Sequence, residues 1–260
     1  GNNYHRQEKL DDAELNFKKA INLKPNYLQA LYNLGLILNK KQRFDDSIFF
    51  FKKVINLKPD FANGYFSLGL AQLNLGDLDT AIVNLKKATD IKPEYPQAFF
   101  NLGVAMRKAE KRIEALEYFQ QSINLKKDYI RAYNLLGVTH KELGQYDEAL
   151  KNFQIAINLD PNYAEAFNNL GNTFKELGKF EESNFYFRKA IDIKPDYADA
   201  YDNLGRASML NLDFQQAFEL MEWRLRREEK NFIPLNTSKP RWDGLTKNRV
   251  FLWQEQGIGE

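Results

Sequence analysis

Residues 99–119 read FFNLGVAMRKAEKRIEALEYF, and this stretch decides the fold because its key positions recur along the chain. Gly103 follows Leu102, a small residue stands twelve positions later at Ala115, and a large apolar residue stands sixteen positions later at Phe119. Steps of 34 residues from Gly103 meet a glycine each time, at Gly1, Gly35, Gly69, Gly137, Gly171 and Gly205. Such a fixed period indicates a repeat architecture.

The residues around each glycine predict two amphipathic helices per repeat. An aromatic residue or leucine lies four positions before the glycine, on the helical face of the leucine that precedes it. These residues are Leu31, Tyr65, Phe99, Tyr133, Phe167 and Tyr201. The second helix carries the small residue twelve positions after the glycine and the large apolar residue sixteen positions after it. A glycine inside a helix costs ~1 kcal/mol relative to alanine, and we expect a close crossing of the two helices to offset that cost.

Glycine, aspartate and proline mark the expected ends of these helices. Gly76, Gly144 and Gly178 stand where the end of the first helix favours a left-handed residue. Asp45, Asp79 and Asp147 are expected to cap the start of the second helix. Proline then ends the second helix, at Pro25, Pro59, Pro93, Pro161 and Pro195.

With its aromatic residue, Leu-Gly pair, small residues and closing proline, the 34-residue unit resembles the tetratricopeptide repeat. The resemblance covers residues 1–229 and implies an all-α fold, a right-handed superhelical solenoid of about seven helix-turn-helix repeats whose first repeat begins mid-helix. Lys127 replaces a proline and Arg112 an apolar residue, so we expect the stacking to be least regular at this middle junction.

Composition excludes several classes of function. Lysine and arginine total 37 against 35 acidic residues, a net charge of +2 that argues against a dedicated nucleic-acid binder. Without cysteine there is no disulfide or thiolate site. His5 and His140 are far apart and make a metal site improbable, so we expect no metal, no cofactor and no catalytic residue in this chain. No stretch is apolar enough to span a membrane, which favours a cytoplasmic protein, although a targeting segment could precede Gly1.

One column of residues on the first helices is predicted to bind a polypeptide. The position two residues before each repeat glycine holds Asn33, Ser67, Asn101, Leu135, Asn169 and Asn203. First helices line the concave face of such arrays, and an amide can pair with a peptide backbone whatever its side chains are. This column resembles the asparagine ladder of the O-GlcNAc transferase repeats, which implies that Asn33, Asn101, Asn169 and Asn203 hold an extended polypeptide. The alternative is that these asparagines only cap or solvate their helices.

Two further sets of residues extend the candidate groove. Tyr32, Phe66 and Phe100 lie one position before the asparagine column and are either binding anchors or packing between adjacent repeats. Arg107, Lys108, Arg131, Lys141 and Lys175 could attract an acidic segment, or could keep the face solvated. Repeat faces of this kind could also support self-association.

The end of the chain departs from the repeat. Residues 230–247 are expected to form a connector, and residues 248–260 a strand followed by a glycine-rich turn. The run from Met221 to Gly259 resembles the junction at which tetratricopeptide repeats lead into a glycosyltransferase-like domain in bacterial proteins. This implies a substrate-recruiting region whose catalytic domain would lie beyond residue 260. The alternative is a short cap that packs Val250, Leu252 and Trp253 on the last helix.

Overall fold

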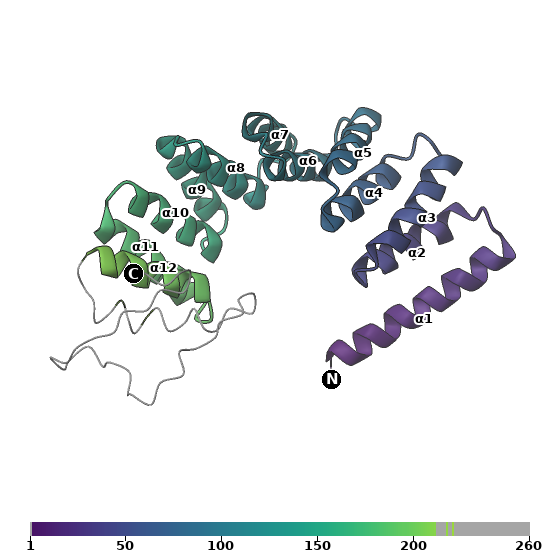
Figure 1. Cartoon of the computed structure of the whole chain (residues 1–260), viewed down its shortest axis with the longest axis horizontal. Coiled ribbons are helices and arrows are strands. Elements are labelled where there is room, and N and C mark those ends of the chain that lie inside the picture. Colours follow the sequence, from purple (N-terminus) through teal and green to yellow (C-terminus); the bar gives the residue numbers. More distant parts are fainter. Residues whose placement is uncertain (1, 212–216, 218–219, 221–260) are drawn as a thin grey trace, which may run out of the picture. The chain divides into compact units, whose positions relative to one another are not determined.

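The computed structural model describes residues 2–211, 217 and 220, with side chains from residue 9 onward, and its ordered elements there are all α-helices. They are α1 (Asn2–Leu23), α2 (Leu28–Lys40), α3 (Phe44–Leu57), α4 (Ala62–Leu75), α5 (Leu78–Ile91), α6 (Pro96–Lys108), α7 (Arg112–Leu125), α8 (Ile130–Glu142), α9 (Tyr146–Leu159), α10 (Ala164–Glu176), α11 (Phe180–Ile193) and α12 (Ala198–Leu210). Figure 1 labels these helices along the chain. The chain divides into two compact units, residues 1–143 and 144–260. The all-α prediction is confirmed. The predicted connector and strand lie outside the described residues.

Helical hairpins stack within each unit. In the first unit α2 pairs with α3, α4 with α5 and α6 with α7, and in the second unit α10 pairs with α11. We call α2, α4, α6, α8, α10 and α12 the first helices, and the odd-numbered helices the second helices. Neighbouring first helices touch one another within a unit, whereas no two second helices of the described chain do. First helices therefore form the inner layer of each unit, and second helices form the outer layer.

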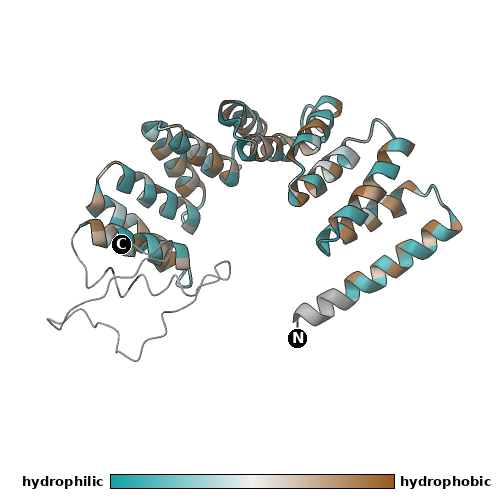
Figure 2. Ribbon diagram, in the orientation of Figure 1, coloured by the Kyte–Doolittle hydropathy of each residue, from teal (hydrophilic) through white to brown (hydrophobic). Residues whose placement is uncertain are grey.

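The repeat glycines allow the close crossing of the two helices of a hairpin. A Cβ atom added at Gly103 would lie 2.7 Å from the ring of Phe119, and one at Gly35 would lie 2.6 Å from the ring of Phe51. Both rings are fully buried. Figure 2 shows apolar and hydrophilic residues alternating along the helices, as amphipathic packing requires. The expected close crossing is confirmed.

The loop between the two helices of a hairpin uses one left-handed residue. Gly76, Gly144 and Gly178 have φ angles of 88°, 72° and 73°, as predicted. The same loop position holds Gln42 and Glu110, whose φ angles are 59° and 61°. A side chain makes this conformation costly, so two of the five loops carry backbone strain that glycine would remove.

The expected capping role of Asp45, Asp79 and Asp147 is wrong. Each lies at the second residue of its helix, where its carboxylate still interacts favourably with the helix dipole. The residue that caps α5 is Asp77, which accepts hydrogen bonds from the Thr80 amide at 3.4 Å and the Thr80 hydroxyl at 2.6 Å.

The two departures from the repeat in the middle of the first unit leave its hairpin intact. α7 ends at Leu125 even though Lys127 replaces the proline. Arg112 forms ion pairs with Glu110 at 2.5 Å and with Glu142 at 3.3 Å in place of an apolar contact. The α6–α7 crossing is as close as its neighbours, because its glycine and aromatic residue are retained.

At the start of the chain, α1 differs from the expected half repeat. It runs unbroken from Asn2 to Leu23, through residues 7–9 that correspond to the loop at residues 41–43. A continuous helix adds a backbone hydrogen bond for each further residue, and here it replaces the turn found in the other repeats.

We expect Gln42→Gly to raise the free energy of unfolding by about 1 kcal/mol, because glycine adopts the left-handed conformation without the steric cost of a side chain. Gln42 is exposed, so little packing is lost. Urea denaturation followed by circular dichroism measures the change. The reverse substitution Gly76→Gln is the matched control, since a Cβ atom there would meet nothing within 4 Å. It should lower stability by a similar amount, and equal stability of all three proteins would contradict the argument.

Candidate binding surface of the first helices

The candidate site is the inner surface of each unit, which the first helices line. Four of them, α2, α4, α6 and α8, lie in the first unit, and α10 and α12 lie in the second. Because each repeat has the same register, one repeat position gives one column of side chains on this surface. The asparagine column predicted from sequence, two residues before the glycine, lies on it.

All four predicted asparagines are half-buried on the first helices. Asn33 accepts a hydrogen bond from the Gln29 amide at 3.2 Å, and Asn101 donates one to the Gln97 carbonyl oxygen at 2.7 Å. These are contacts within one helix, as the local alternative requires. A primary amide has two N–H donors and an oxygen with two lone pairs, so a single local bond leaves capacity for a peptide backbone.

Asn203 differs, because its amide links two first helices. It donates a hydrogen bond to the Asn168 side-chain oxygen at 3.0 Å, and Asn168 is buried. The same pair of repeat positions is linked in the first unit, where the Tyr32 hydroxyl and the Ser67 hydroxyl lie 3.1 Å apart. This bridge between neighbouring repeats is a structural role that the sequence analysis did not identify.

The aromatic residues of the neighbouring column pack between adjacent repeats. Their partners lie 29 residues further along the chain, at the start of the next first helix. Ring centroids are separated by 5.2 Å for Tyr32 and Phe61, 4.9 Å for Phe66 and Tyr95, and 4.9 Å for Phe100 and Tyr129. Burial in these contacts raises the pKa of Tyr95 to about 12 and also raises the pKa of Tyr129.

Of the three column aromatics, Phe100 is the least accessible, with 2% of its surface exposed. This burial favours the interpretation of Phe100 as packing between adjacent repeats over its interpretation as a binding anchor. Tyr32 and Phe66 are half-buried, so part of each side chain remains accessible. The partner aromatics could have been found from the sequence, because Phe61, Tyr95 and Tyr129 recur at the repeat period.

Most of the predicted basic residues contact groups of the chain itself. Arg107 forms an ion pair with Glu142 at 2.6 Å, and the Arg131 guanidinium lies 5.1 Å from the centre of the Phe100 ring. Lys175 donates a hydrogen bond to the Asn172 side-chain oxygen at 3.0 Å. Lys141 is half-buried and also has an interaction partner. These contacts weaken the case for a strongly acidic ligand.

A further column was missed by the sequence analysis. The residue after each repeat glycine is half-buried and apolar in the first unit, at Leu36, Leu70, Val104 and Val138. In the second unit it is Asn172 and Arg206. The inner surface of the first unit thus carries the amides Asn33 and Asn101 beside aliphatic side chains, a combination that can bind both the backbone and the side chains of an extended peptide.

Nothing in the described part of the chain forms a group of three or more acidic residues and histidines that could hold a metal ion. None of the helices described has both the length and the apolar character needed to cross a membrane.

Comparison with protein families gives matches to tetratricopeptide models over more than half of the chain. A model described as a TPR repeat matches residues 1–42, 73–109 and 139–178. Three models described as tetratricopeptide repeats match residues 28–61, 50–83 and 164–197. A search of curated protein sequences gives no match.

Solved structures give the same result. YrrB, described as "a TPR protein with an unusual peptide-binding site", is 28% identical with a TM-score of 0.58, and the match covers 71% of this chain and 95% of that one. MamA is 27% identical with a TM-score of 0.59, covering 64% of this chain and 96% of that one. A chain of the APC/C hetero-tetramer Cut9-Hcn1 has a TM-score of 0.70 at 16% identity, and the match covers 85% of this chain and 44% of that one. At this identity the likeness shows the fold alone. The superhelical repeat class is thereby confirmed.

Proposed function

Because the chain belongs to the tetratricopeptide repeat family, we propose that it is a protein-binding scaffold that holds an extended polypeptide against its first helices. The observation that carries the proposal is the column of half-buried amides at Asn33, Asn101 and Asn169. Amide groups that recur at one repeat position suit the backbone of an extended chain, whatever its side chains are. The peptide-binding site described for YrrB supports the same class of function.

The aliphatic column after the repeat glycines is expected to favour some peptide sequences over others. Leu36 and Val104 lie one helical turn from Asn33 and Asn101, and Leu70 lies one turn from Ser67, since three residues separate the two columns. A polypeptide held by the amides in the first unit would therefore place side chains against these residues. We expect ligands with spaced aliphatic or aromatic residues to bind more tightly than wholly polar ones.

The proposal predicts that the triple variant Asn33→Ala, Asn101→Ala, Asn169→Ala binds peptide at least tenfold more weakly. Each lost hydrogen bond removes ~0.5–1.5 kcal/mol of net interaction, and every 1.4 kcal/mol is a factor of ten. The ligands would be unstructured 15-residue peptides selected from a random displayed library on the unmodified chain. Fluorescence polarisation measures their dissociation constants. Asn203 is excluded, because its loss would leave the buried Asn168 oxygen without its donor.

A matched control uses asparagines on the second helices. Asn152 donates to the carbonyl oxygen four residues before it, as Asn101 does. Asn124 and Asn158 accept from a glutamine four residues earlier, as Asn33 does. The triple alanine variant of these three residues should keep full affinity. Equal affinity of the two triple variants would show that the inner amides do not bind the ligand.

The resemblance of residues 221–260 to repeat–glycosyltransferase junctions supports a second candidate. In it, the first helices present an acceptor protein to a transferase domain in the same polypeptide. The two candidates share the groove and differ in what adjoins it. Sequencing the gene past the codon for Glu260 distinguishes them, because a continuation of 250 residues or more with alternating strands and helices is typical of such a domain.

A further inference from the structure

The outer layer of the first unit carries exposed apolar residues in register. Leu15, Phe49 and Val83 occupy the same repeat position on α1, α3 and α5, and 52%, 53% and 66% of their surface is exposed. Glu117 and Lys151 occupy this position on the next two second helices. The apolar run is thus confined to three neighbouring helices. We call Leu15, Phe49 and Val83 the outer patch.

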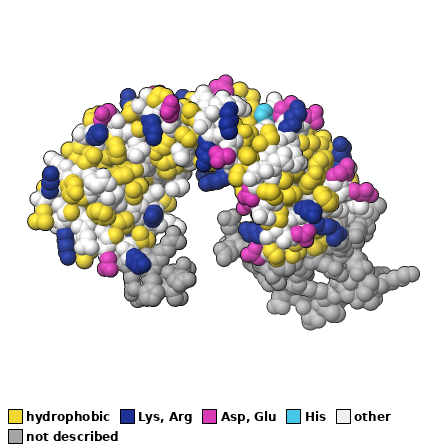
Figure 3. All heavy atoms as spheres, turned by 180° about the vertical axis from the view of Figure 1, so that it is seen from behind, with side chains coloured by type: hydrophobic (Ala, Val, Ile, Leu, Met, Phe, Trp, Pro, Cys, Tyr) yellow, Lys and Arg dark blue, Asp and Glu magenta, His cyan; other side chains and the backbone are white. Residues whose placement is uncertain are grey.

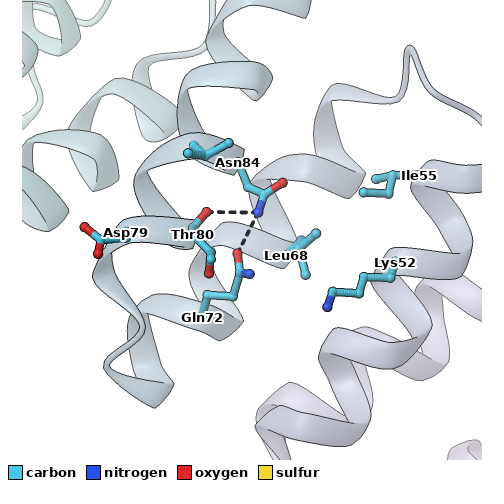
Figure 4. Close-up of a pocket in the computed structure, with 8 residues that line it drawn as sticks. Lys52, Ile55, Leu68, Gln72, Asp79, Thr80 and Asn84 are labelled. Carbon is cyan, nitrogen blue, oxygen red and sulfur yellow. Dashed lines mark hydrogen bonds between the residues drawn. The ribbon is translucent and has the colours of Figure 1, made fainter.

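A pocket opens beside this patch, between α3 and α5, with α4 as its floor (Figure 4). Its volume is about 380 Å³, and Ile55, Leu68 and Val83 supply apolar lining. Asn84 donates a hydrogen bond to the Gln72 side chain at 2.8 Å inside it. Apolar pockets next to exposed apolar residues mark interaction surfaces, and Figure 3 shows hydrophobic side chains reaching the surface of the chain in several places.

The pocket is lined by one cation and one anion from different helices. Lys52 lies in the C-terminal half of α3, and Asp79 lies in the first turn of α5. Within the described residues, neither forms an ion pair. Figure 4 shows the two side chains on opposite sides of the pocket. When a second copy of this surface is turned by 180° and placed against the first, the positive charge of each copy faces the negative charge of the other.

We propose that the outer patch and its pocket form a self-association surface, on which a second copy of this chain docks with the same surface about a two-fold axis. In such a contact, if residue i meets residue j, then j meets i. A two-fold axis between Lys52 and Asp79 therefore pairs each Lys52 with Asp79 of the other copy, giving two ion pairs. The pocket has room for an aromatic side chain, and Phe49 lies on α3 one helical turn before Lys52, which lines the pocket.

The size of the surface indicates a weak dimer. Helices of 14 residues are about 21 Å long, but the outer helices of the described chain do not pack on one another, so the contact is limited to their exposed apolar residues and the pocket between α3 and α5. Such a contact is smaller than the standard interface of about 800 Å² on each partner. The dimer should be reversible, with a dissociation constant in the micromolar range.

Sedimentation velocity of the whole chain, from about 1 μM to about 300 μM, measures this equilibrium. We expect Phe49→Asp to raise the dimer dissociation constant at least tenfold. Phe185→Asp is the matched control. Phe185 occupies the same repeat position in the second unit, is 54% exposed, and lies beside Lys189 as Phe49 lies beside Lys53. It should leave the dissociation constant unchanged. Equal weakening by the two variants would overturn the proposal.

Charge exchange tests the two-fold geometry itself. Lys52→Glu and Asp79→Lys should each weaken the dimer several-fold, because each creates two like-charge contacts. The double variant recreates both ion pairs with reversed signs and should return to within about threefold of the unmodified protein. Both residues are exposed, and circular dichroism of each variant verifies the fold. A chain that stays monomeric over the whole concentration range, or a double variant as weak as the singles, would overturn the proposal.

Discussion

Gly103→Leu is expected to lower the free energy of unfolding by about 3 kcal/mol. A Cβ atom alone at this position would lie 2.7 Å from two carbon atoms of the Phe119 ring, well inside van der Waals contact. The ring is fully buried and packs on Phe100 at 5.9 Å between centroids, so it has no space into which to move. Overpacking of a dense core costs 1–3 kcal/mol or more. Urea denaturation followed by circular dichroism gives the value.

Lys108→Leu provides the comparison, because it adds the same side chain to the same helix at an exposed position. It should change stability by less than about 0.5 kcal/mol. Gly103→Ala should fall between the two, since it adds only the Cβ atom. If Gly103→Leu were as stable as Lys108→Leu, close crossing would not be the reason for the repeated glycine.

The repeat period predicted the fold because each repeat meets mainly its neighbours. A glycine and an aromatic residue sixteen positions apart are brought together inside one hairpin, so their contact follows from local sequence alone. Gly35 with Phe51 and Gly103 with Phe119 obey this rule. Helix ends were predicted less well. Two aspartates stand near the start of α5, and the backbone of the loop makes Asp77 the cap while Asp79 lies inside the helix.

The sequence predicted only part of the candidate site, and the reason is physical. The period assigns residues to a face of the first helix, but burial on that face depends on how adjacent hairpins stack. Phe100 and Asn101 are neighbours in sequence, yet Phe100 is buried against Tyr129 while Asn101 is half-buried. Likewise, the partner of Arg107 is Glu142, 35 residues away. The Phe100–Tyr129 contact follows only when the columns of adjacent repeats are compared, and the Arg107–Glu142 ion pair follows from no column of the repeat.

One buried acid departs from the repeat pattern altogether. Glu14 is only 7% exposed, although Ile48, Ile82 and Leu116 hold the same repeat position. It accepts contacts from Lys18 at 2.7 Å, Lys41 at 2.5 Å and Arg43 at 2.9 Å. Hydrogen bonds from Lys18 and then Lys41 lower the pKa of Glu14 to about 2. This cluster joins α1 to the loop after α2.

Glu14→Gln is expected to lower the free energy of unfolding at pH 7 by about 2 kcal/mol. The pKa of Glu14 is lower in the folded chain than the ordinary value of 4.5. The folded state therefore binds the proton less well than the unfolded state, and this stabilisation is fully present above pH 4.5. It is lost as the pH falls from 4.5 toward 2. The difference in unfolding free energy between the two proteins should shrink over that window, as urea titrations at successive pH values would measure.

A double variant separates the charge from the position. Lys41 stands where other repeats have Leu75 and Leu143, so Glu14→Ile with Lys41→Leu gives both positions the apolar residues that other repeats have there. Replacing a buried ion pair with apolar residues is often neutral or stabilising, whereas removing one partner leaves a buried charge without its counter-ion. We therefore expect the double variant to be at least as stable as the unmodified chain at pH 7 and to lose less stability between pH 4.5 and 2. A double variant as unstable as Glu14→Gln would mean that the ion cluster is required at this junction, because apolar packing could not replace it.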